Sequence, residues 1–111
     1  MERLTDAMLA EAGIDVEHHF GGGVYAKDTR IPKGKRLVQH VHPFDHLSVL
    51  AVGTVVVEVD GAREVFVGPR CLTIKAGKAH AVEALTDAVW FCIHATSETD
   101  PTKVDDAILK G

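Results

Sequence analysis

Histidine is the residue through which this chain could do chemistry: there are 7 His in 111 residues, against one Trp and one Tyr. His40 and His42 are two residues apart in a segment that reads as a β-strand, so both side chains leave the same face. Pro43-Phe44-Asp45 then turns the chain, and His46 opens the next expected strand. Three imidazoles therefore converge near one end of a hairpin.

A fourth histidine, His80, follows the turn at Gly77 and opens another expected strand, which an antiparallel barrel can fold onto the same place. A single histidine is more often a surface or hydrogen-bonded residue, but the whole pattern, H-x-H-x-x-x-H with a distant G-x-x-H, favours a metal. Neutral imidazole nitrogens bind divalent transition metals well. We predict a divalent ion (Mn, Fe, Ni, Co or Zn), with the ligands His40, His42, His46 and His80.

The elements that must position these ligands are short β runs separated by Gly, Pro and Asp. Asp60-Gly61 is a hairpin turn signal between two β-branched runs. Eight strands without intervening helices predict an antiparallel sandwich or barrel, because parallel strands need long crossovers. We expect the strands at Val24–Lys27, Arg36–Val41, His46–Val52, Thr54–Val59, Arg63–Val67, Cys71–Lys75, His80–Ala84 and Val89–His94.

The two ends of the chain differ from this β-rich centre. The first thirteen residues predict a short helix with an apolar stripe and Gly13 at its C-terminal stop. Gly21-Gly22-Gly23 predicts a loop, and His18 and His19 are assigned to the N-terminal surface. We divide the single domain into residues 1–23 (helix and Gly-rich loop), 24–97 (barrel) and 98–111 (tail, as helix or edge strand).

Size and charge exclude several classes of protein. A chain of 111 residues predicts one domain. Its formal net charge of −4 disfavours nucleic acid as a partner. There is no apolar run long enough for a membrane helix and no secretory signal, and two cysteines are too few for a disulfide scaffold. We expect a cytoplasmic protein that binds a small molecule and neither nucleic acid nor a membrane.

The last expected strand leaves two arrangements open. Trp90, Cys92 and His94 share one face by alternation, and Val89, Phe91 and Ile93 share the other. If the first set faces inward, it walls the pocket, and His94 could orient a substrate or carry a proton. Because every residue of the second set is apolar, the sequence slightly favours the opposite arrangement, with His94 on the outer face.

The spacing of these residues resembles that of the cupin superfamily. Gly34, His40, His42, His46 and Gly53 stand at the intervals of the first cupin motif, G-x5-H-x-H-x3–4-E-x6-G, with His46 in place of the glutamate. The segment from Gly68 to His80 resembles the second motif, G-x5-P-x-G-x2-H-x3-N. It has one extra residue, and Lys75 and Ala84 replace Pro and Asn.

The resemblance implies a double-stranded β-helix, that is, a jelly-roll or cupin barrel of the all-β class, here with a short N-terminal helix. The histidine in place of glutamate resembles the small four-histidine cupins, single-domain proteins that hold manganese or a related divalent ion. The resemblance also implies a homodimer.

Two functions follow from such a centre. The first is a metal-dependent enzyme, with a dioxygenase-type oxidoreductase as the leading chemistry and an isomerase or lyase also open. Its substrate would be a small oxygenated metabolite that chelates the ion through two oxygens. A general base is missing, and Asp45 and His94 are only secondary candidates for acid–base work. The absence of a clear base supports the second function, a non-catalytic cupin that binds an anion or serves as an interaction module.

Overall fold

The computed structural model describes residues 6–39, 43–96 and 100. His40 and His42 lie outside the described residues, as do most of the expected tail and the first five residues. The described part contains one short helix and nine strands: α1 (Asp6–Glu11), β1 (Asp15–Gly21), β2 (Val24–Ile31), β3 (Arg36–Gln39), β4 (His46–Val52), β5 (Thr54–Val59), β6 (Ala62–Val67), β7 (Arg70–Ile74), β8 (His80–Ala84) and β9 (Ala88–Ala95).

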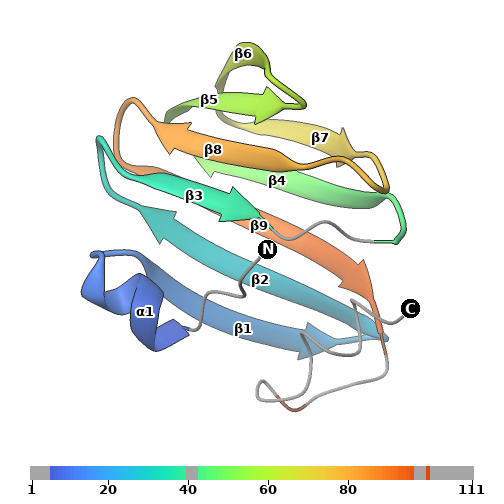
Figure 1. The fold of residues 1–111 in the computed structure, drawn as a ribbon. Helices are drawn as coiled ribbons and strands as arrows, with labels where there is room; N and C mark the ends of the chain where they lie inside the picture. Colours follow the sequence, from blue (N-terminus) through green and yellow to red (C-terminus); the bar gives the residue numbers. More distant parts are fainter. Residues whose placement is uncertain (1–5, 40–42, 97–99, 101–111) are drawn as a thin grey trace.

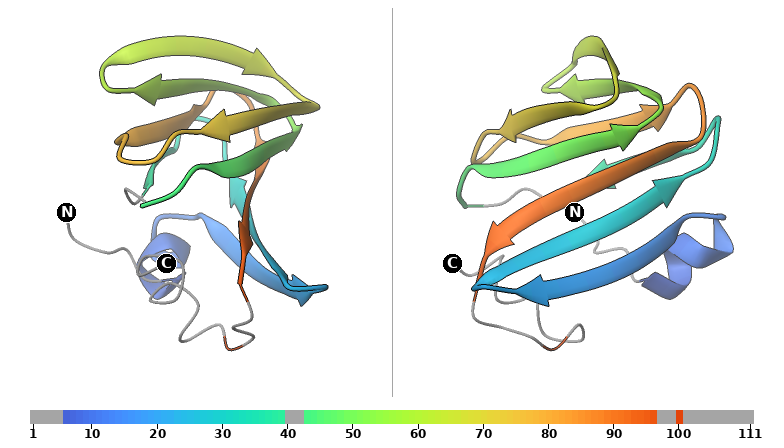
Figure 2. Two further views of the ribbon diagram at one scale, coloured as in Figure 1. Left: turned by 90° about the vertical axis from the view of Figure 1, so that its right-hand side faces the viewer. Right: turned by 180° about the vertical axis from the view of Figure 1, so that it is seen from behind.

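The strands form two antiparallel sheets that face each other (Figures 1 and 2). One sheet has five strands in the order β1-β2-β9-β4-β7, and the other has four in the order β3-β8-β5-β6. Neighbours within each sheet are mostly distant in sequence, which is the connectivity of a jelly roll. The expected all-β, antiparallel fold with a short N-terminal helix is confirmed.

The space between the sheets is filled by side chains from both. Trp90 and Leu50 of the five-stranded sheet and Val55 and Val82 of the four-stranded sheet are fully buried in one apolar cluster. Burying side chains of this size contributes about 1.5–3 kcal/mol each. The apolar core therefore joins the two sheets, and the polar residues buried with it in the described part of the chain, Thr29 and Ser48 among them, are few.

Strand β1 is the main departure from the sequence-based expectation, which placed no strand before Val24. Its side chains alternate between exposed and half-buried, and its last residue, Gly21, pairs with Val24 of β2. Gly22 and Gly23 both have positive φ, 60° and 76°, as a two-residue turn between antiparallel strands requires. The glycine run is therefore a tight hairpin turn, which brings His18 and His19 into the five-stranded sheet.

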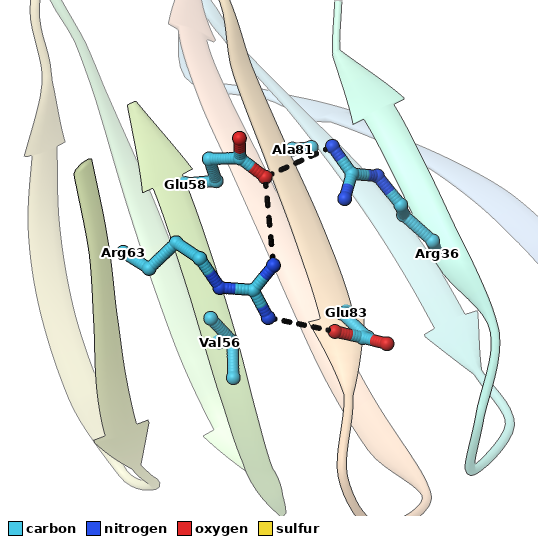
Figure 3. A pocket seen from close by; sticks show the side chains of 6 residues that line it. All are labelled: Arg36, Val56, Glu58, Arg63, Ala81 and Glu83. Carbon is cyan, nitrogen blue, oxygen red and sulfur yellow. Dashed lines mark hydrogen bonds and ion pairs between the residues drawn. The ribbon is translucent and has the colours of Figure 1, made fainter. Parts of the chain in front are cut away.

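The outer face of the four-stranded sheet carries a ladder of alternating charges (Figure 3). Glu58 Oε2 lies 3.0 Å from Arg36 Nη2 and 3.9 Å from Arg63 Nη1, and Arg63 Nη2 lies 3.2 Å from Glu83 Oε2. These four side chains come from all four strands of the sheet. Exposed pairs of this kind contribute about 0–1 kcal/mol each, so the ladder favours the correct strand register more than overall stability.

Within the described part of the chain, no helix has the length and apolar character needed to cross a membrane.

Gly53, between β4 and β5, gives a test of how closely the chain there packs against the start of β9. Its φ is +99°, and an added Cβ would press against the Asp87 carbonyl oxygen and stand 2.9 Å from the Ala88 Cα. We predict that Gly53→Ala lowers the free energy of unfolding in urea by about 3 kcal/mol, because both strain and overlap oppose it. Gly22→Ala is the control: its φ is +60° but the surrounding space is open, so about 1 kcal/mol is expected. Equal losses would contradict the close approach at Gly53.

Candidate metal centre

Three histidines from three strands meet inside the protein at one end of the sheets. His46 begins β4, His80 begins β8 and His94 lies near the end of β9, and their exposed fractions are 6%, 3% and 6%. The ring centroids of His46 and His94 are 4.5 Å apart with an interplanar angle of 28°. Those of His46 and His80 are 6.0 Å apart. The structure therefore brings together the two predicted ligands that it describes, and adds His94 beside them.

Strand register explains why His46 and His80 meet. His46 points inward with Ser48 and Leu50, because alternate residues of β4 are buried. His80 pairs with Val59 of β5 on one side and with Gln39 of β3 on the other. Gln39 is the residue directly before His40, so β3 leads the chain from the pairing partner of His80 into the predicted H-x-H segment.

The electrostatics at His46 suit a metal ligand. Burial, and then the neighbouring His80, lower the pKa of His46 to about 4, and Asp45 opposes this shift. At neutral pH the His46 imidazole is therefore uncharged, with a lone pair on one ring nitrogen. A divalent ion needs that form of histidine.

Asp45, a secondary candidate for acid–base work, is exposed in the turn before β4. Its Oδ1 accepts a hydrogen bond from the Ala76 amide at 2.8 Å, and its Oδ2 lies 3.5 Å from Lys75 Nζ. The Ala76 hydrogen bond and the Lys75 charge lower the pKa of the Asp45 carboxyl. The side chain thus ties the turn before β4 to the turn after β7, which helps to place His46.

His94 faces inward, contrary to the arrangement that the sequence slightly favoured. Trp90, Cys92 and His94 are 0%, 3% and 6% exposed, whereas the alternate residues of β9 are half-buried on the outer face. The prediction was wrong because it took the purely apolar set to be the interior set. This end of the interior is polar, and the apolar set lies on the outer face of the sheet.

Two further residues belong to this polar end: Tyr25, which the sequence offers as one pocket or rim residue among several, and His18, which was assigned to the N-terminal surface. Tyr25 is fully buried, and its hydroxyl lies 2.7 Å from His18 Nδ1. The Tyr25 ring also stacks toward His94, with centroids 6.4 Å apart. A row of rings therefore runs from His18 through Tyr25 and His94 to His46. The hairpin signal at Gly22-Gly23 could have revealed His18, because it makes the preceding segment the partner of β2.

A thiol and a hydroxyl lie deeper in the same interior. Ser48 Oγ donates to Cys92 Sγ at 3.7 Å, and both residues are buried. Burial raises the pKa of the Cys92 thiol, and the hydrogen bond from Ser48 and the charge of Lys27 oppose the shift. Cys92 is therefore a protonated thiol at neutral pH, and its nucleophilic form is suppressed.

Solved structures share this architecture at low sequence identity. A cupin superfamily protein from Desulfitobacterium hafniense aligns with a TM-score of 0.66 and 16% identity over 76% of this chain and 78% of its own. KdgF from Halomonas sp. aligns with a TM-score of 0.65 and 15% identity over 74% of this chain and 77% of its own.

A larger protein contains the same fold as a part. Salicylate 1,2-dioxygenase from Pseudoaminobacter salicylatoxidans, in a structure with gentisate, aligns with a TM-score of 0.67 and 11% identity. The alignment covers 81% of this chain and 29% of the dioxygenase chain. No model of a known protein family matches the sequence, and no curated protein matches it by sequence. Together with the two facing sheets, these likenesses show that the chain has the cupin-type fold.

The depressed pKa of His46 predicts a pH dependence of stability in chelator-treated protein. Its pKa is about 4 in the folded protein against 6.5 for the ordinary side chain, so protons favour the unfolded chain. This contribution is present above about pH 6.5 and is lost as the pH falls toward about 4. Between about pH 7 and about pH 5, we expect this residue to account for a loss of about 2 kcal/mol in the free energy of unfolding.

The measurement is urea unfolding of wild type and His46→Gln at both pH values. The variant should lose about 2 kcal/mol less than wild type on acidification, whatever its stability at neutral pH. The same pH dependence in both proteins would show that His46 is not the residue responsible.

Proposed function

We propose that this protein is a metal-dependent cupin enzyme of the dioxygenase type, which acts on a small oxygenated metabolite at a four-histidine centre. The observation that carries the proposal is the burial of His46 and His80 side by side, with His46 held uncharged by its surroundings. The predicted ligands are His46 and His80 together with His40 and His42. The identity of the ion is left among Mn, Fe, Ni, Co and Zn.

The donor set fits such an ion. Imidazole nitrogen suits divalent transition metals, and four neutral ligands leave the charge of the ion uncompensated. When bound with open coordination positions, such an ion would supply Lewis acidity toward an oxygenated substrate that binds it through two oxygens. The protein's contribution is then to bind, orient and desolvate that substrate.

The residues around the histidines suit an anionic, oxygen-rich ligand. His94 lies next to His46 and can donate a hydrogen bond to a substrate oxygen, and the Tyr25–His18 pair lies beyond it on the same interior face. Lys27 lies two residues along β2 from Tyr25, on the same side of the sheet, and its charge acts on Cys92. A positive charge near the interior favours an anionic ligand.

Support for oxygen chemistry in particular comes from the fold of the dioxygenase solved with gentisate, which this chain resembles in shape. The second candidate is a metal-stabilised cupin that binds a small anion without chemistry. It is favoured by the position of Asp45, whose carboxylate is exposed and engaged with Ala76 and Lys75 rather than turned toward a substrate. If the protein is instead an enzyme, proton transfer would depend on the histidines and Tyr25 rather than on Asp45.

The metal centre is tested by elemental analysis of protein purified from metal-replete medium. After exhaustive dialysis, which removes ions held with only micromolar affinity, we expect about one transition-metal ion per chain, and a reduction of at least about tenfold in that content for His46→Gln. Glu64→Gln, an exposed residue of β6 that belongs to neither group of histidines, is the control and should keep the ion. Wild-type protein without stoichiometric metal would refute the centre.

The choice between enzyme and binding protein is then made by oxygen consumption with small diketones, thiols and catechols. An enzyme should consume oxygen in a metal-dependent way with one of these classes, and His46→Gln should abolish it. No consumption across the panel by metal-loaded protein would favour the non-catalytic alternative.

We also propose that the protein is a homodimer through the outer face of the four-stranded sheet. Val38, Val65 and Val67 are 42%, 58% and 65% exposed there, around the Arg–Glu ladder. Static light scattering should give about twice the chain mass for wild type and one chain mass for Val65→Glu. Val24→Glu, on the outer face of the other sheet, should leave the dimer intact. A monomeric wild type would contradict the proposal.

A further inference from the structure

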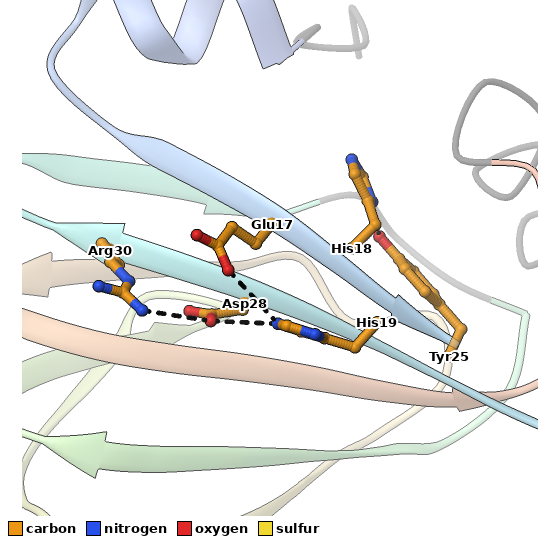
Figure 4. Close-up of polar contacts among 6 residues, drawn as sticks. All are labelled: Glu17, His18, His19, Tyr25, Asp28 and Arg30. Carbon is orange, nitrogen blue, oxygen red and sulfur yellow. Dashed lines mark hydrogen bonds and ion pairs between the residues drawn. The ribbon is translucent and has the colours of Figure 1, made fainter. Parts of the chain in front are cut away.

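The outer face of the β1–β2 hairpin carries a second group of metal-binding side chains, formed by Glu17, His19 and Asp28 (Figure 4). Glu17 and His19 are two residues apart on β1, and Asp28 of β2 is the direct pairing partner of Glu17. Because side chains alternate along a strand, these three point away from the face that bears His18 and Tyr25. The group is therefore separate from the interior histidines and has no part in the function proposed above.

The distances within this group combine one long hydrogen bond, between His19 and Asp28, with a spacing close to that of ligands around a divalent ion. His19 Nε2 lies 3.3 Å from Asp28 Oδ2 and 3.8 Å from Glu17 Oε2, and the ligand atoms of the three residues all lie within 4.8 Å of one another. An N–H···O hydrogen bond is usually about 2.7–3.2 Å long. Ligands held tetrahedrally at about 2.1 Å from zinc lie about 3.4 Å apart. His19 Nε2 thus already lies at nearly the distance from each of the two carboxylates that such an ion imposes.

The charges in this group leave a deficit of positive charge. Two carboxylates stand directly opposite each other on neighbouring strands, an arrangement that is unfavourable without a cation. Arg30 Nη2 lies 3.8 Å from Asp28 Oδ2 and supplies one positive charge. With His19 neutral, the formal charge of the four side chains remains negative.

Asp28 gives an independent indication of a ligand. Its side chain is only 5% exposed, although it lies on the outer face of the sheet. Its Oδ1 atom is buried and, among the described residues, has no hydrogen-bond donor. A buried carboxylate normally has each oxygen paired with a donor or coordinated to a metal. Asp28 is thus a buried carboxylate in the middle of the group. Its Oδ2 contacts His19 and Arg30, whereas its Oδ1 has no donor among the described residues.

We propose that Glu17, His19 and Asp28 form a second divalent-cation site, of the zinc class, on the outer face of the β1–β2 hairpin. One imidazole nitrogen and two carboxylates are ligands of the kind that zinc takes, and three protein ligands leave a position for water. The hairpin presents all three from a paired backbone, so binding requires little rearrangement beyond the side chains. Arg30 competes with the ion for Asp28, and its exposed side chain can move away when the ion binds.

The test is a titration of the full-length, chelator-treated protein with zinc, followed residue by residue by two-dimensional NMR of the backbone amides. Saturable shifts are expected at residues 17–19 and 26–28, with a dissociation constant in the micromolar range. Glu17→Gln should weaken this binding by at least about tenfold, because it removes one ligand. Glu64→Gln, an exposed glutamate on β6 outside the group, is the matched control and should leave the binding unchanged.

Arg30→Gln distinguishes the proposed site from a cluster of ion pairs. If Arg30 competes with a cation, its removal should tighten zinc binding. If the group is only an ion-pair cluster, zinc should cause no saturable shifts at these residues in either protein. That result, or equal effects of Glu17→Gln and Glu64→Gln, would overturn the proposal.

The outer site can be judged whether or not the interior centre exists. In His46→Gln, zinc should still shift residues 17–19 and 26–28, while shifts near His80 and His94 should be lost. Zinc-dependent shifts confined to the interior histidines in wild type would refute the outer site and leave the proposed function standing.

Discussion

The alternation of side chains along β9 is the constraint on which the rest of the structure depends. One face of this strand supplies Trp90 to the apolar core and, two and four residues further on, Cys92 and His94 to the polar end. β9 lies at the centre of its sheet, paired with β2 and β4. A shift of one residue would turn all three side chains outward. The apolar core therefore fixes the register that also brings His94 against His46.

Much of the fold could be predicted because several strands are short β-branched runs bounded by turn residues. The bounds of β4, β5 and β8 match the sequence-based expectation residue for residue. β1 was missed because its inward side chains, Val16, His18 and Phe20, include a histidine, and its outward ones are charged or polar. Such a strand has no clear contrast between an apolar and a polar face, although a tight turn follows it.

Residues of the candidate site could be predicted only where a metal-binding residue type also stands at the spacing of a motif. His46 and His80 could be proposed because each belongs to a recognisable pattern of histidines and glycines. The contribution of Tyr25 and His18 depends on the pairing of β1 with β2, for which the Gly22-Gly23 turn was the available but unused signal. His94 was expected on the outer face for a physical reason. An apolar set of side chains identifies the inward face of a strand only where the interior is apolar, and the interior around His94 is polar.

His18 and His19 are neighbours in sequence, yet one contacts Tyr25 in the interior and the other contacts Asp28 on the outer face. The single strand β1 thus separates two polar environments, one on each of its faces. Substitutions on one face of β1 leave the polar environment on the other face unaltered, so the two faces can diverge independently. An insertion or deletion of one residue between His19 and the Gly22-Gly23 turn lacks that freedom, because the turn fixes the register and both histidines would exchange faces at once.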